Sequence, residues 1–361
     1  MISRLTGRRP AYRGAALGMV FAVGSAVLAG CGGSTASSSD SLRVMTWGGV
    51  FTEAERGAYY GPFTEATGIK VAEVSPVSLA KIKAGVTNKT YDVDTSSLSS
   101  SEYFQAVGEG LLEPIDYTVV KKAGDVPPDV YEEYGVKANS ISYQLVYNSD
   151  KFTQQGPQSW ADFYDVAKFP GDRALWDSPI GNIEFALLAD GMTPDQLYPL
   201  DDEKLDRAFK KLDEIKPHIK IWWQQGAQSQ QLFQDGEVDL MMMWNGRATD
   251  LIRQGQPLTQ VWNQAGLAVN RWIVPKGTPN AGKAMEFINA ALDPQKQANF
   301  AETLGYGPSV PSAFDLLSPE EAALQPGSPL HGDVEFEIDG QWWGENLGDV
   351  LPRWQNWLSQ G

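Results

Sequence analysis

The sequence has few of the residues on which most enzymes and metalloproteins depend. Its 361 residues include one cysteine, Cys31, and two histidines, His218 and His331. A single thiol cannot form an internal disulfide, and two isolated histidines support neither a Ser–His–Asp triad nor a histidine-rich metal site. A glycine-rich phosphate loop is also missing. We therefore expect no catalytic residues, no metal and no cofactor, and we do not expect an enzyme.

Basic residues are scarce as well. The chain has 29 Lys and Arg against 45 Asp and Glu, a net charge of −16. Four of the arginines and none of the acids precede Cys31, so a chain beginning there has 25 basic and 45 acidic residues and a net charge of −20. Such a surface repels nucleic acid and anionic headgroups. We therefore exclude nucleic acid as a partner.

Long hydrophobic runs are missing too, because no apolar stretch approaches the ~20 residues that span a bilayer. The longest covers residues 15–28, follows a basic stretch and ends at Leu28-Ala29-Gly30-Cys31. This order is typical of a secretory signal peptide, and its final cysteine resembles a bacterial lipobox. We expect residues 1–30 to be the signal peptide and residues 31–41 to be a flexible tether. A lipid on Cys31 would anchor the exported protein to the outer face of the cytoplasmic membrane.

Beyond the tether, strand-like runs alternate with helical patterns. Residues 42–47 alternate as a strand does, a helical pattern covers 53–67, and Gly68 ends it before the next strand. Residues 91–94 predict a further strand, which leads into a serine-rich loop over 96–101. The stretch 144–270 shows the same alternation of strand-like and helical patterns. The alternation predicts an α/β fold with a mainly parallel sheet, and roughly 330 residues are enough for two lobes.

Six short motifs then occur in order along the chain. They are F-T-E-A-T-G-I-K-V at 63–71, Y-D-V at 91–93 before the serines, S-W-A-D-F at 159–163, F-P-G at 169–171, G-E-V-D to W-N-G over 236–246, and A-E-T-L-G-Y at 301–306. In this order the chain resembles the bacterial extracellular solute-binding proteins of ABC importers, of the spermidine/putrescine-binding type. The match covers nearly all of the chain after the leader.

The resemblance implies a two-lobed, type II periplasmic-binding-protein-like fold. Each lobe is expected to hold a mainly parallel sheet flanked by helices, and β crossovers near 142–148 and 268–275 would join them. Lobe 1 would comprise 42–142 plus 272–325, and lobe 2 would comprise 143–271 plus 326–361. A small ligand would be captured in the cleft between the lobes and delivered to the permease subunits. We expect a monomer.

The resemblance also assigns a ligand site. Family members surround an amine with aromatic side chains, whose faces attract a cation by ~0.5–2 kcal/mol per desolvated contact. Twelve tryptophans are present, and filling a core is the ordinary use of such a residue, which we favour for Trp160 and Trp354. The ligand-binding residues that we expect from the motif matches are Trp47, Gly48, Ser97, Ser99, Asp177, Ser178, Trp244, Arg247, Asn270, Tyr306 and Trp343 (or, in place of the last, Trp342).

The acidic residues at the matched positions do not decide which class of ligand is bound. Of the matched positions only Asp177 is acidic, whereas Ser178, Gly181 and Asn270 stand where a polyamine would need more carboxylates. An arginine in the cleft, Arg247 or Arg271, would suit a ligand carboxylate, although either could instead form a salt bridge within the protein. The ligand is therefore a polyamine such as putrescine or spermidine, or alternatively a zwitterionic amine such as γ-aminobutyrate. An exported glycosidase that uses Asp177 and Glu184 is a distant alternative.

Overall fold

The computed structural model describes residues 41–121, 126–331 and 334–360. These residues belong to one compact unit. The expected signal peptide, Cys31 and all of the expected tether except Ser41 lie outside them. Within the described stretches, no helix is both long enough and apolar enough to cross a bilayer.

A mixed sheet organises the described chain, with strand order β2-β1-β3-β8-β4-β7-β5-β6. The strands of its first half run parallel to one another, and so do those of its second half. The first half contains β1 (Ser41–Met45), β2 (Lys70–Val74) and β3 (Thr95–Leu98), and the second half contains β5 (Arg173–Trp176), β6 (Ile219–Trp223) and β7 (Leu240–Trp244).

Two long strands, β4 (Val136–Asn148) and β8 (Leu258–Ile273), join the halves. At 13 and 16 residues they exceed the usual strand length of ~3–10 residues. They pair with each other in antiparallel fashion, while β8 also pairs with β3 and β4 also pairs with β7. The stretches 142–148 and 268–273 lie on these two strands. Short strands β9 (Gly307–Pro308) and β10 (Phe336–Glu337) add to β4 and β8.

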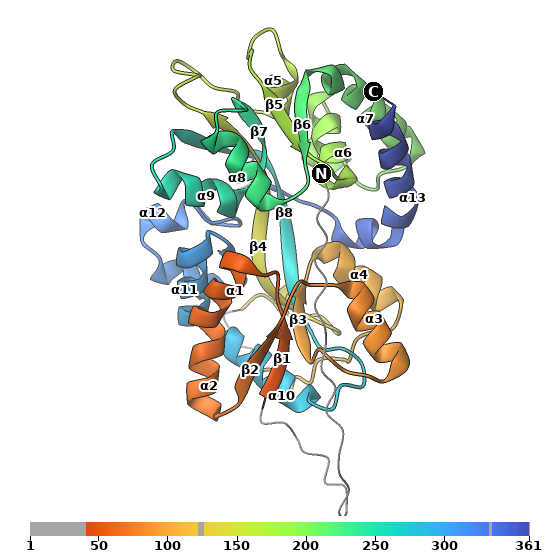
Figure 1. Cartoon of the computed structure of the whole chain (residues 1–361), viewed down its shortest axis with the longest axis vertical. Coiled ribbons are helices and arrows are strands. Elements are labelled where there is room, and N and C mark those ends of the chain that lie inside the picture. Colours follow the sequence, from red (N-terminus) through yellow and green to blue (C-terminus); the bar gives the residue numbers. More distant parts are fainter. Residues whose placement is uncertain (1–40, 122–125, 332–333, 361) are drawn as a thin grey trace, which may run out of the picture. The chain divides into compact units, whose positions relative to one another are not determined.

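Helices cover both faces of each half (Figure 1). In the first half, α1, α2 and α11 lie on one side of β1 and β3, and α3 and α4 lie on the other (Figure 1). The first-half helices are α1 (Gly49–Glu55), α2 (Gly61–Thr67), α3 (Leu79–Asn88), α4 (Ser100–Gly108), α10 (Ala281–Ala291) and α11 (Pro294–Leu304). The others are α5 (Trp160–Tyr164), α6 (Pro179–Ala189), α7 (Asp202–Ile215), α8 (Gly226–Gln234), α9 (Asn245–Arg253), α12 (Pro319–Ala322) and α13 (Gly340–Ser359).

The halves have separate apolar cores. The second-half core is built around fully buried tryptophans, among them Trp160, Trp223 and Trp354. The main first-half core contains Trp272 and Phe287, which pack edge to face. Burial of this kind contributes roughly 25 cal/mol per Å² of apolar surface, so each half has its own source of stability.

The strand expected over 91–94 is wrong, and so is the serine-rich loop after it. The strand is β3, Thr95–Leu98, and it includes the first serines. A buried strand tolerates these hydroxyls because its neighbours accept their hydrogen bonds. Thr95 Oγ1 donates to the carbonyl of Ile273, and Ser96 Oγ donates to the carbonyl of Met45.

Candidate functional site

Expected site residues lie at or just after the carboxyl ends of four strands, β1, β3, β5 and β7. After β1, Trp47 is 39% exposed, and Gly48 adopts φ 85°, a left-handed conformation that favours glycine. The backbone N–H of Gly48 donates to Thr52 Oγ1 on α1. After β7, Trp244 leads directly into α9. Parallel strands present their carboxyl ends at one edge, where α/β proteins place ligand sites.

An aromatic cluster surrounds Trp244. The ring centroids of Trp176 and Trp223 lie 5.4 Å and 5.3 Å from that of Trp244, and both rings are steeply inclined to it. Tyr143 stands 5.6 Å from Trp176. The indole Nε1 of Trp244 is buried without a hydrogen-bond partner among the described residues. Trp223 is fully buried in the second-half core, so the partly exposed rings of Trp176 and Trp244 are the ones that can contact the methylenes and the ammonium of an alkylamine.

Sequence reasoning missed Tyr143 and Trp176 as members of this cluster. Trp176 directly precedes Asp177 at the end of β5, and this strand-end position was the one available signal. Tyr143 reaches the cluster because β4 pairs with β7, opposite Trp244. That antiparallel register joins residues about a hundred positions apart and leaves no local trace in the sequence.

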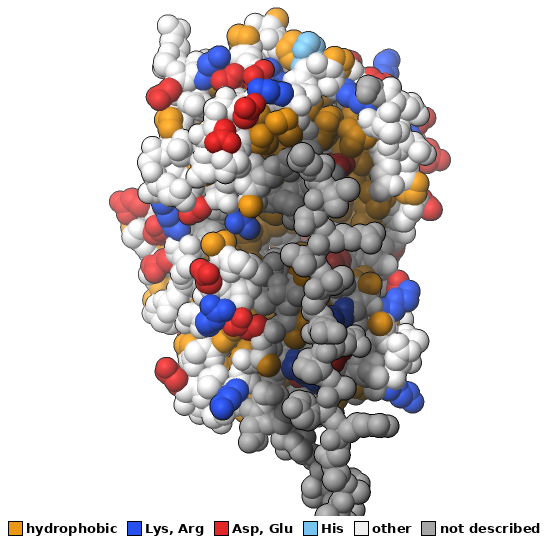
Figure 2. Space-filling view, in the orientation of Figure 1, with side chains coloured by type: hydrophobic (Ala, Val, Ile, Leu, Met, Phe, Trp, Pro, Cys, Tyr) orange, Lys and Arg blue, Asp and Glu red, His pale blue; other side chains and the backbone are white. Residues whose placement is uncertain are grey.

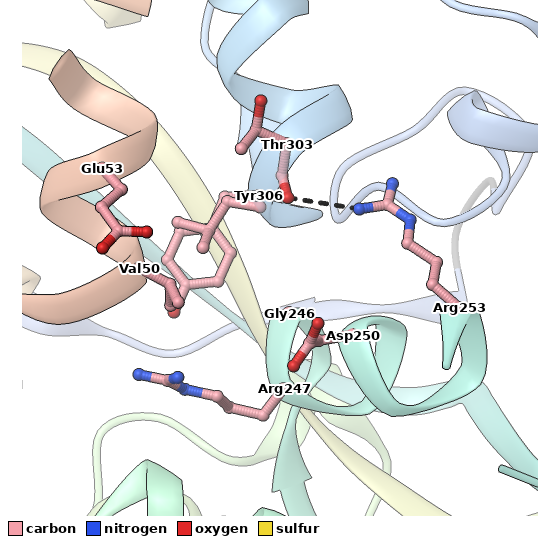
Figure 3. Close-up of a pocket in the computed structure, with 9 residues that line it drawn as sticks. Val50, Glu53, Gly246, Arg247, Asp250, Arg253, Thr303 and Tyr306 are labelled. Carbon is pink, nitrogen blue, oxygen red and sulfur yellow. Dashed lines mark hydrogen bonds between the residues drawn. The ribbon is translucent and has the colours of Figure 1, made fainter. Parts of the chain in front are cut away.

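A cavity of about 150 Å³ lies between α1, α9 and the end of α11. Figure 3 shows Arg247 and Tyr306 at this cavity, together with Val50 and Glu53 of α1. Of the expected site residues, Arg247 and Tyr306 line it. The described residues that line it are Val50, Glu53, Gly246, Arg247, Asp250, Arg253, Thr303, Leu304 and Tyr306.

Arg247 is half-buried and has no carboxylate within salt-bridge distance in the part of the chain described. Its Nη1 donates to Gln230 Oε1 at 3.3 Å. Burial raises the pKa of Tyr306 above its usual value, although the positive charge of Arg247 opposes that rise, so the tyrosine remains a neutral phenol. A partly buried guanidinium without a counter-ion can donate hydrogen bonds to a ligand carboxylate.

Asp177 is placed differently from the expectation that it shares a cleft with Arg247. Its Oδ1 accepts from Trp354 Nε1 of α13, and its Oδ2 accepts from Gln224 Nε2, both at 3.0 Å. It lines a second, open cavity of about 310 Å³ together with the end of α13. Both carboxylate oxygens are therefore used within the protein.

Trp343 cannot contact a ligand in this arrangement, and the expectation for it is corrected. Its side chain is 0% exposed, and its Nε1 donates to Glu184 Oε1 at 2.6 Å. Glu184 is itself fully buried, which raises the pKa of its carboxyl, and it also accepts from Gly181 N–H. A buried Glu184 cannot pair with Asp177 on an accessible substrate, so the glycosidase alternative has no support here. Ser178 Oγ accepts from Ile180 N–H and caps α6.

The remaining expected residues belong to the first half and the long strands. Ser97 is fully buried, and its Oγ has no partner within the described stretches. Ser99 caps α4 and donates to Glu102 Oε2 at 2.7 Å. Asn270 Nδ2 donates to Asn139 Oδ1 at 2.9 Å, which ties β8 to β4.

Arg271, the other candidate for a ligand carboxylate, is buried and occupied. Its Nε donates to both carboxylate oxygens of Glu132 at 2.9 Å. Its Nη1 donates to Ser100 Oγ at 2.7 Å. Of the two arginines, Arg247 is therefore the one that faces a cavity without a carboxylate partner.

Comparisons with known proteins give a consistent family. Residues 58–326 match the family model described as bacterial extracellular solute-binding protein. A γ-aminobutyric acid-binding protein of Pseudomonas aeruginosa is 34% identical over 325 residues, which cover 89% of this chain and 92% of that protein. A spermidine/putrescine-binding periplasmic protein of Salmonella typhimurium is 26% identical over 348 residues, covering 93% and 95%. The solved structure of the Atu4243–GABA receptor superposes with a TM-score of 0.82 at 37% identity, covering 89% and 98%.

Proposed function

The chain belongs to the bacterial extracellular solute-binding proteins, which serve ABC transporters, and we propose that it captures a small zwitterionic amine such as γ-aminobutyrate. Its fold is the two-lobed α/β fold of type II periplasmic binding proteins. Family members bind a small solute and deliver it to a membrane permease. The identity of the solute is the part that we propose.

The half-buried guanidinium of Arg247 carries this proposal. It lines the cavity between α1, α9 and α11 without a carboxylate partner in the described chain. A ligand carboxylate would supply that partner through two parallel hydrogen bonds. The 34% identity to a γ-aminobutyric acid-binding protein points to the same ligand class.

The cavity lining offers charges of both signs, as a zwitterionic ligand requires. Among the described residues the lining contains two acids, Glu53 and Asp250, and two arginines, Arg247 and Arg253, of which Arg253 is already paired with Glu321. A zwitterion places its ammonium near acids and its carboxylate near an arginine. A polyamine would face the unpaired guanidinium of Arg247, and Asp177, the acid expected to hold a polyamine, lines a different cavity.

A polyamine remains the second candidate. The cluster of Tyr143, Trp176 and Trp244 suits any alkylammonium. Similarity to a spermidine/putrescine-binding protein over 93% of the chain is the observation that favours it.

We further propose that the lobes are 42–142 plus 272–325 and 143–271 plus 326–361. The separate apolar cores of the two halves support this division, and β4 and β8 would act as the crossovers. The protein would be exported, held at the outer face of the cytoplasmic membrane by a lipid on Cys31, and would act as a monomer that passes its ligand to the permease.

The proposal is tested by calorimetry with γ-aminobutyrate, putrescine, spermidine and a neutral sugar. We expect γ-aminobutyrate to bind most tightly. Arg247→Ala should weaken its binding 10- to 100-fold, or about 1.4–2.8 kcal/mol, because the carboxylate loses its partner.

Arg207→Ala is the matched control, since Arg207 is an exposed arginine of α7 paired with Asp190. It should bind γ-aminobutyrate as the wild type does. Tight spermidine binding that does not depend on Arg247 would replace the zwitterion with a polyamine. Tight binding of the sugar alone would rule out both amines.

A further inference from the structure

The start of α9 is fastened to two other segments by one amide. Asn245 directly follows Trp244 and is fully buried. Its Oδ1 accepts from the backbone N–H of Ser142, on the crossover strand β4, at 3.0 Å. Its Nδ2 donates to the backbone carbonyl of Gly305, just beyond α11. The Asn245 side chain therefore links lobe 2 to the crossover and to lobe 1 at the same time.

The next residue allows these segments to approach closely. A Cβ on Gly246 would lie 2.6 Å from the carbonyl oxygen of Leu304 and 2.9 Å from Cδ1 of Tyr306. Cβ atoms do not come this near to a backbone oxygen, and the oxygen belongs to the end of α11, so it cannot rotate away alone. Any residue larger than glycine would push the end of α11, with Tyr306, away from α9.

Arg253 makes a similar contact at the other end of α9. Its Nη1 donates to the carbonyl of Thr303 at 3.3 Å (Figure 3), and its Nη2 forms an ion pair with Glu321. The carbonyls of Thr303 and Gly305 belong to the end of α11, where backbone acceptors lack partners inside the helix. Donors from lobe 2 supply those partners, and a cation is favoured at this end of a helix dipole.

We propose that Asn245 and Gly246 are positioning residues that form an interlobe latch: they hold Tyr306 of lobe 1 in the cavity lined by Arg247 of lobe 2. Neither residue needs to touch the ligand. The latch brings residues of both lobes to one cavity. Separating the lobes breaks its contacts, so the energy of these contacts adds to the affinity for the ligand. The inference rests on the proposed function, in that ligand capture is taken to require both lobes at the cavity.

Asn245→Asp is the sharpest test. The aspartate keeps an oxygen for Ser142 N–H but turns a carboxylate oxygen toward the Gly305 carbonyl, so a hydrogen bond becomes a repulsion. Gly246→Ala is the second variant, because it blocks the approach of α11 without changing charge. Asn263→Asp, an exposed residue of lobe 2 whose Nδ2 donates to the Gln158 carbonyl, matches the first variant in charge.

Two readouts are used for the wild type and the three variants. Small-angle scattering gives the radius of gyration with and without saturating γ-aminobutyrate, and stopped-flow tryptophan fluorescence gives its dissociation rate. We expect Asn245→Asp and Gly246→Ala to be more expanded than the wild type and to release γ-aminobutyrate about 10- to 100-fold faster. Asn263→Asp should match the wild type in both.

The thermal unfolding temperature shows whether each variant folds, and the contacts lie between the cores, so we expect folded proteins. If both latch variants keep the wild-type radius of gyration in both conditions, the latch is wrong. If they expand but the wild type does not bind γ-aminobutyrate, the latch is supported and the proposed ligand is wrong.

Discussion

At the scale of single residues, buried carboxyl groups behave differently from the surface acids that dominate the composition. Glu55 of α1 is fully buried and accepts from Tyr60 Oη at 2.6 Å and from Thr46 Oγ1 at 2.5 Å. Burial raises its pKa to about 8, and the hydrogen bonds from Thr46 and Tyr60 offset only part of that rise. The carboxyl is therefore protonated at neutral pH, directly behind the turn that carries Trp47.

This protonation makes stability depend on pH. An acid whose pKa is higher in the folded than in the unfolded protein stabilises the fold fully at low pH and loses that contribution as pH rises to the folded value. We expect the melting temperature to fall between about pH 5 and pH 8. Burial also raises the pKa of Glu184 and Glu335, which act in the same direction.

Glu55→Gln measures how much of this pH dependence of the melting temperature comes from Glu55, because glutamine imitates the neutral carboxyl and does not titrate. Its melting temperature should fall less than that of the wild type over this range. Glu53→Gln, two residues away on an exposed site of the same helix, is the control and should follow the wild type. Parallel curves for all three proteins would show that Glu55 is ionised in the fold.

At the scale of elements, α13 explains why two expected ligand residues, Trp343 and Asp177, form hydrogen bonds within the protein. Its first turn packs on α4 of the first half of the sheet, where a Cβ on Gly340 would lie 2.8 Å from Ser100 Oγ. Further along, Trp343 and Trp354 are buried in the second-half core, and their indole N–H groups bind Glu184 and Asp177. Two tryptophans of α13 therefore donate to Asp177, an expected ligand residue, and to Glu184, a residue of the glycosidase alternative.

Truncating Trp343 should act on stability and not on recognition. Trp343→Ala should lower the free energy of unfolding by about 3–5 kcal/mol, because it leaves a cavity and an unpaired Glu184. Urea unfolding measures the loss, and calorimetry on the folded protein should give wild-type affinity for γ-aminobutyrate. Trp47→Ala provides the contrast, since that side chain is exposed at the end of β1 and should affect affinity more than stability. The reverse pattern would restore Trp343 to the ligand site.

At the scale of the whole molecule, the net charge of −16 is distinct from the charge at the site. Where residues are described on the face shown in Figure 2, acidic and basic side chains are interspersed. Exposed charges more than roughly 8 Å away are screened at physiological salt. The overall charge can attract cations, but it cannot select one.

Salt dependence separates attraction by the surface from binding at the site. We expect the affinity for γ-aminobutyrate to change less than about threefold between 50 and 500 mM NaCl, because a neutral zwitterion feels little long-range field. Any spermidine association that comes from the surface should weaken steeply over the same range. Calorimetry at three salt concentrations measures both, and a steep dependence for γ-aminobutyrate would argue against a local, charge-balanced site.

The sequence by itself determined the family and the α/β fold class, because ordered motifs and strand–helix alternation are local patterns that survive in the linear chain. It also singled out Arg247 and Tyr306 through the W-N-G and G-Y motifs, and both residues line one cavity, while their contact with a ligand stays a prediction. The boundary of β3 was misplaced, since serines in a buried strand look like a loop until their neighbours supply acceptors.

Only the tertiary structure decided which polar groups are free. Arg271 is a candidate ligand group in the sequence, yet Glu132, from a distant segment, already pairs with it. Asp177 lines a different cavity from Arg247 and accepts a hydrogen bond from Trp354 of α13. Tyr143 joins the aromatic cluster through strand register alone. Local patterns specify elements, whereas the occupancy of a carboxylate or a guanidinium depends on contacts made across the fold, and no spacing in the chain encodes those contacts.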